Sequence, residues 1–156
     1  MDSPNPEKIR IPLLQRLTDG DGWASTRVWK AGIGTKENAN FIIELLASLK
    51  IYSFPCNTGV EIRRKHDLKR AAELPLFRYS RGRLARIRQL NDMIECQNRS
   101  SIEGDEARYI LQLREKDLPY GRISEILWDE YEVSRRPSTI CAFVNRIRNE
   151  EGHNIQ

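Results

Sequence analysis

The chain has 156 residues, of which 39% are hydrophobic and 31% charged, and its formal net charge is +4. This composition is typical of a soluble globular protein, and the length allows one sizeable core or two small ones. No apolar run approaches the roughly 20 residues that a membrane-spanning helix needs, which excludes the membrane-embedded classes. Because the N-terminus also lacks the pattern of a signal peptide, we expect an intracellular protein, nuclear if the source is eukaryotic.

The N-terminal part of the chain, residues 1–98, is predicted to be a helical domain. Residues 1–8 are expected to form a flexible arm, and a short helix over 12–18 is expected to end at the Asp-Gly repeat of residues 19–22. Residues 23–34 contain two tryptophans and two glycines, and we interpret them as a loop docked on the core.

Three further helices are predicted before residue 98. The first, over 36–50, has the widest apolar face, made by Phe41, Ile42, Leu45, Leu46 and Leu49. A short extended segment over 51–54 is followed by a helix over 58–74, which Pro75 ends. The third helix runs over 80–97, and polar residues 98–101 separate it from the next domain.

Basic residues concentrate in the middle of the chain. The basic segment over 63–88 holds ten Lys and Arg against two acids, whereas residues 89–134 hold eleven acids against five bases. This asymmetry indicates a polyanionic partner for the basic segment, or pairing between segments of the chain itself. Within the basic segment, Arg81, Arg83, Arg86 and Arg88 are predicted to contact phosphates, and the alternative is the solvated face of a long helix.

Residues 102–150 are predicted to form a three-helix domain, followed by a tail over 151–156. Apolar residues at helical spacing indicate helices over 105–116, 120–131 and 137–149. The third helix has two faces, of which the inward one is Ile140, Phe143, Val144 and Ile147. The other side of this helix, with the residues before it, is predicted to bind DNA: Arg135, Arg136, Ser138, Thr139, Asn145, Arg146 and Arg148. Arginine forms bidentate hydrogen bonds with guanine, asparagine does so with adenine, and hydroxyl groups donate hydrogen bonds to phosphates.

This domain resembles Myb-like and SANT-like domains. The run Leu118–Leu127 resembles their second helix, and Asn145–Arg148 resembles the end of their recognition helix. Tyr120 and Ile147 stand where Myb repeats carry tryptophan, and the turn over 131–140 also resembles a helix-turn-helix of the homeodomain-like class. The homeodomain-like superfamily is therefore the better match, and it implies an all-α fold that binds duplex DNA.

These patterns lead us to expect a DNA-binding protein, namely a transcriptional regulator or a chromatin-associated factor. The alternative is a non-catalytic protein-interaction subunit of a chromatin-type assembly, whose partners dock through the acidic stretch over 89–134. We expect neither an enzyme nor a bound cofactor or metal. Cys56, Cys96 and Cys141 form no C-x-x-C pair, and His66 and His153 stand at no metal-ligand spacing and beside no nucleophile.

Overall fold

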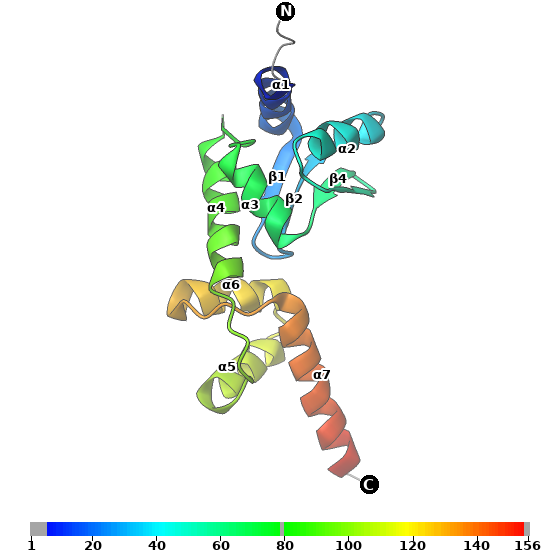
Figure 1. Ribbon diagram of the computed structural model, residues 1–156. Coiled ribbons are helices and arrows are strands. Elements are labelled where there is room, and N and C mark those ends of the chain that lie inside the picture. The colour runs from blue at the N-terminus through cyan, green and yellow to red at the C-terminus, as the bar shows by residue number, and fades with distance from the viewer. Residues whose placement is uncertain (1–5, 79, 155–156) are drawn as a thin grey trace, which may run out of the picture. The chain divides into compact units, whose positions relative to one another are not determined.

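The computed structural model describes residues 6–78 and 80–154, and Figure 1 shows their course. The chain divides into two compact units between Asp92 and Met93, somewhat before the boundary expected at 98–101. The first unit contains a four-stranded antiparallel sheet. The predicted all-α class is therefore wrong, because the described residues form a mixed α/β fold of seven helices and four strands.

Helix α1 (Pro6–Asp21) is longer than the helix predicted over 12–18. The part of the predicted arm that precedes Pro6 lies outside the described residues. The helix continues into the Asp-Gly repeat, and two of its last four carbonyl groups, which no helical amide reaches, accept from Arg83. The Arg83 guanidinium donates to the carbonyl oxygen of Thr18 at 2.9 Å and also to that of Asp19.

Residues 23–34, which were predicted to be a loop, form most of a β-hairpin instead. Strands β1 (Gly22–Ser25) and β2 (Lys30–Gly34) pair antiparallel. The Ser25 hydroxyl accepts the amide of Arg27 at 3.2 Å and organises the turn. The hairpin contributes two of the four strands, and the extended segment predicted over 51–54 overlaps a third, β3 (Phe54–Cys56), only at Phe54.

The helix predicted over 58–74 is also wrong in its first part, where strand β4 (Gly59–Ile62) pairs with both β2 and β3 (Phe54–Cys56). The strand order is β1-β2-β4-β3. All four residues of β4 are buried, and the strand is too short for its alternation of apolar and charged residues to exclude a helix. Helix α3 (Lys65–Glu73) replaces the rest of the predicted helix.

One face of the sheet forms the core of the first unit. Its buried side chains are Ala24, Ala31, Ile33, Val60 and Ile62. Helix α1 contacts β1 and β2, and α2 (Ala39–Ser48) contacts β3 and β4. The buried residues Leu68 of α3 and Leu90 of α4 (Arg81–Glu95) add to the apolar interior.

The second unit is built from α5 (Gly104–Glu115), α6 (Tyr120–Tyr131) and α7 (Pro137–Asn154). These bounds lie close to the predicted ones, except that α7 continues into the predicted tail, whose last two residues lie outside the described part. The core of the unit consists of Ile102, Ile110, Leu113, Ile123, Leu127, Ile140, Phe143 and Val144. None of the helices in the described ranges is long and apolar enough to cross a membrane.

Candidate nucleic-acid interface

Helix α7 presents two chemically different faces. Ile140, Phe143 and Val144 are buried in the core of the second unit, and Ile147 packs against it. This inward face is the one that the spacing of the apolar residues predicts. Because it fixes the rotation of the helix about its axis, it also fixes which side chains face solvent.

The solvent side of α7 holds five of the predicted site residues. Ser138, Thr139, Asn145, Arg146 and Arg148 are all exposed. The Arg146 guanidinium lies 5.7 Å from the centroid of the Phe143 ring, a cation–π contact that orients it. Arg146 and Thr139 also line a shallow hollow of about 290 Å³ together with Ser100 and Ser101.

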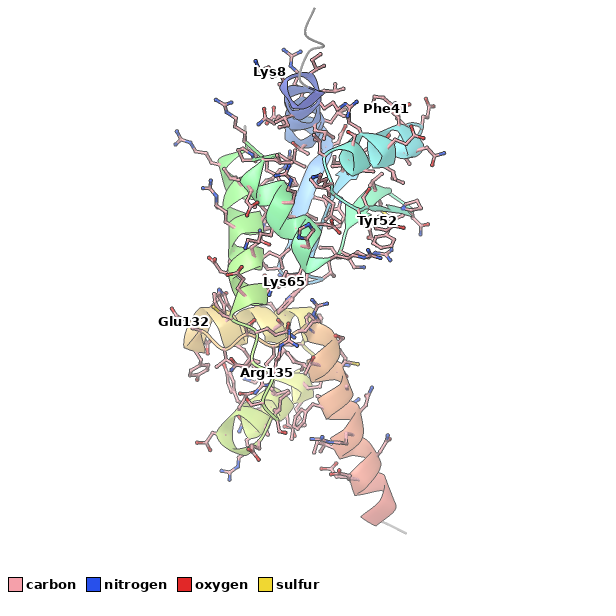
Figure 2. The ribbon with its side chains drawn as sticks, in the orientation of Figure 1. Lys8, Phe41, Tyr52, Lys65, Glu132 and Arg135 are labelled. Atoms are coloured by element: carbon pink, nitrogen blue, oxygen red, sulfur yellow. The ribbon has the colours of Figure 1, made fainter. Side chains whose placement is uncertain are left out.

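Arg135 is not available to nucleic acid, which corrects its predicted role. Only 2% of the residue is exposed, and Figure 2 shows it inside the second unit. Its Nε donates to Oε1 of Glu106 at 2.8 Å, and its Nη1 donates to the carbonyl oxygens of Asn98 at 3.2 Å and of Ser100. Arg135 therefore ties the segment before α7 to the start of α5.

Two serines also fix the connection between α6 and α7. The Ser124 hydroxyl donates to the carbonyl oxygen of Arg135 at 2.6 Å, and the Ser134 hydroxyl donates to that of Met93. The Asn98 amide donates in turn to the carbonyl oxygen of Ser134 at 2.8 Å. Arg136, the next residue, is half-buried. The segment that leads into α7 is consequently rigid, and rigid support is what a recognition helix needs to hold a register.

The arginines of α4 divide into two kinds. Arg81, Arg86 and Arg88 are exposed and compatible with the predicted phosphate contacts. Arg83 is half-buried and donates to the last carbonyl oxygens of α1. Its first role is therefore to hold α1, and the central arginine group that faces solvent is Arg81, Arg86 and Arg88.

The structure adds a surface that the sequence analysis missed, the open face of the sheet opposite the core. One row across the four strands consists of Trp23, Gly32, Glu61 and Phe54, of which Gly32 and Glu61 are buried and Trp23 and Phe54 are half-buried. The Trp23 indole covers Gly32 so closely that a Cβ atom on Gly32 would lie 2.7 Å from it. Glu61 in this row lies 3.6 Å from Lys30 Nζ and also pairs with Arg63.

Basic and aromatic side chains interleave at the β3 edge of this face. The Arg63 guanidinium lies 4.4 Å from the Phe54 ring centroid, and the Arg64 guanidinium lies 4.4 Å from that of Tyr52. The two rings meet edge to face with centroids 5.0 Å apart, and Figure 2 shows Tyr52 on the outside of the unit. We name this set the open sheet face: Trp23, Lys30, Tyr52, Phe54, Glu61, Arg63 and Arg64.

A surface of this kind suits nucleic acid for a general reason. Aromatic rings stack on bases of any sequence, and the guanidinium and ammonium groups beside them meet phosphates. The alternation of Val60, Glu61, Ile62 and Arg63 is the sequence signal that points to it. That signal was obscured because the same residues were assigned to the start of a long helix.

Searches of protein-family models, of curated proteins and of solved structures find no match to this chain. In the part of the chain that the structure describes, no three His, Cys, Asp or Glu residues gather where they could hold a metal ion.

Proposed function

We propose that the protein binds duplex DNA, with α7 as the recognition helix of a helix-turn-helix unit. The observation that carries the proposal is the two-faced character of α7, whose core side is apolar and whose solvent side exposes Thr139, Asn145 and Arg146. An α-helix fits the major groove, where arginine and asparagine each recognise one purine in bidentate fashion. A transcriptional regulator or a chromatin-associated factor is the class of protein that this chemistry serves.

Two further surfaces support the proposal by supplying contacts that do not depend on sequence. The central arginine group, Arg81, Arg86 and Arg88, brings three exposed positive charges on one helix. The open sheet face adds Arg63 and Arg64 beside the exposed Tyr52 ring and the half-buried Phe54 ring. Contacts to phosphates and sugars position a protein on DNA, whereas contacts to base edges specify the site.

A comparison of two variants on two kinds of duplex tests this assignment. A preferred duplex is first selected by the full chain from a randomised library, and affinities are then measured by fluorescence anisotropy on that duplex and on random DNA. Arg146→Ala should weaken binding to the selected duplex by about 1–3 kcal/mol and binding to random DNA much less. Replacing both Arg81 and Arg88 by Ala should weaken binding to the two duplexes about equally and reduce the salt dependence.

Arg108→Ala is the matched control, because Arg108 is an exposed arginine of the second unit that lies on α5 and not on α7. Its affinity for both duplexes should stay within about twofold of the unmodified protein. If Arg146→Ala binds both duplexes as the unmodified protein does, α7 is not the recognition helix. If the unmodified protein binds no DNA at low salt, a protein-interaction subunit with a SANT-like domain becomes the better proposal.

A further inference from the structure

A groove between α5 and α6 has a chemistry opposite to that of the solvent side of α7. It encloses about 650 Å³ and is lined by Asp105, Glu106, Arg108, Tyr109, Gln112, Leu127, Tyr131 and Val133. None of these residues belongs to α7. The volume falls within the range of pockets that take a ligand or a side chain with its flanking backbone.

Apolar side chains and two tyrosine rings line the groove. Leu127 is a core residue and Val133 packs against the core. Tyr109 and Tyr131 meet edge to face with ring centroids 5.6 Å apart. Tyr131 is 59% exposed, so a face of its ring is open to whatever enters the groove.

The rim of the groove is rich in carboxylates. Asp105 lies in the first turn of α5, and Glu130 and Glu132 flank Tyr131 at the end of α6, whereas the Glu106 carboxylate is already paired with Arg135. The negative C-terminal end of the α6 dipole and the positive N-terminal end of the α5 dipole both lie at the groove, so the side-chain carboxylates decide the sign of its charge. Arg108 is the one basic residue among those that line the groove, and it lies 3.7 Å from Asp105.

The Tyr109 hydroxyl belongs to this acidic rim. It donates a hydrogen bond to Oε2 of Glu130 at 2.8 Å. Because this hydrogen bond stabilises the phenol, it raises the pKa of Tyr109 above its ordinary value. The same hydrogen bond holds the Glu130 side chain beside the rings.

We propose that this groove binds a segment of a partner protein that carries lysine or arginine between apolar residues. The cation would lie over the open face of Tyr131 with carboxylates around it, and the apolar neighbours would cover Leu127 and Val133. A cation over an aromatic face and beside an acidic rim gains from both contacts. The negative rim repels DNA phosphates, so a partner in this groove and DNA on α7 do not compete for the same side chains.

The probe for the test is a fluorescein-labelled synthetic peptide of alternating lysine and leucine, measured by anisotropy on the full chain. A peptide with glutamate in place of lysine is the charge control. The unmodified protein should bind the lysine peptide and not the glutamate peptide. Tyr131→Ala should weaken binding of the lysine peptide about tenfold, since it removes both the ring and apolar contact area.

Tyr52→Ala is the matched variant, because Tyr52 is 53% exposed and lies in the first unit. It should change binding of the lysine peptide less than twofold. A second variant removes charge without changing the packing, since Asp105 is fully exposed. Asp105→Asn combined with Glu130→Gln should weaken binding of the lysine peptide at least fivefold. Its circular dichroism spectrum should match that of the unmodified protein.

The proposal is overturned if the unmodified protein does not bind the lysine peptide, or if Tyr131→Ala and Tyr52→Ala behave alike. It is also overturned if the double amide variant binds the lysine peptide as the unmodified protein does. Should Tyr131→Ala weaken binding to duplex DNA and leave peptide binding intact, the groove belongs to the nucleic-acid surface instead. Each of these outcomes is independent of whether Arg146 reads bases, so failure of one proposal does not imply failure of the other.

Discussion

The residue type of Arg135 alone does not determine its role in the protein. An arginine shortly before a helix with a polar solvent side is well placed for nucleic acid, and Arg135 was predicted to bind DNA. What decides its role is Glu106, whose carboxylate accepts from it across a sequence separation of 29 residues. A pairing at that separation leaves no trace in local spacing, so the sequence could indicate the charge of Arg135 but not its burial.

Removing the Arg135 side chain should destabilise the second unit. Arg135→Ala leaves Glu106 and two backbone carbonyl groups without their donor, and loss of one partner of a buried ion pair costs about 3–5 kcal/mol. Equilibrium unfolding in urea, followed by circular dichroism, measures the free energy of unfolding. Arg108→Ala is the control, because Arg108 and Asp105 form an exposed pair whose loss should cost at most about 0.5 kcal/mol. Equal and small losses for the two variants would contradict the structural role of Arg135.

Elements with a wide apolar stripe could be predicted from the sequence, and short strands could not. Helices α2, α5, α6 and α7 each repeat apolar residues at helical spacing, and each lies within a few residues of its expected place. The strands have three to five residues, which is too few for an alternation of apolar and polar residues to be distinguished from the start of a helix. In β2 two glycines also interrupt the pattern, because Gly32 leaves room for the Trp23 indole on the neighbouring strand.

The close packing at Gly32 makes a prediction at the level of the sheet. A Cβ atom there would lie 2.4 Å from the Val60 carbonyl oxygen and 2.7 Å from the Trp23 indole. Gly32→Ala should therefore lower the free energy of unfolding by about 1–3 kcal/mol and change the tryptophan fluorescence.

Gly82→Ala is the matched control for Gly32→Ala. Gly82 lies in α4, and a Cβ atom there would meet nothing within 4 Å. Alanine at this helical position should stabilise the protein by about 0.5–1 kcal/mol, because it restricts the unfolded chain more than glycine does. If Gly32→Ala is as stable as Gly82→Ala, the packing of the Trp23 indole does not require glycine at position 32.

The whole molecule consists of two units with separate cores, and each carries surfaces of different chemistry. The first unit holds the open sheet face and the central arginine group, and the second holds α7 and the acidic groove. The charge asymmetry along the sequence indicated basic and acidic surfaces. The groove lies within the acidic stretch over 89–134, but the sequence could not show that Tyr109, Leu127 and Tyr131 come together there, because only the packing of α5 on α6 brings them side by side.

Because the two units have separate cores, we expect a mutation in one core to reduce the protection of amide hydrogens from exchange in that unit alone. Ile123 is fully buried in the core of the second unit, and Ile123→Ala should cost about 2–5 kcal/mol there. Amide hydrogen exchange, followed residue by residue, should accelerate in α5, α6 and α7 and stay slow in β2 and β4. Equal acceleration in both units would show that they unfold as one.

The affinity of the full chain for random duplex DNA across a salt series is the most direct measurement of the proposed function. If Arg146 and the central arginine group neutralise phosphates, the logarithm of the association constant should fall linearly with the logarithm of the salt concentration, by about 0.9 per phosphate contact. Several contacts predict a steep line and dissociation constants of about 10⁻⁴–10⁻⁶ M at physiological salt. A flat line, or no binding at low salt, would contradict a DNA-binding function.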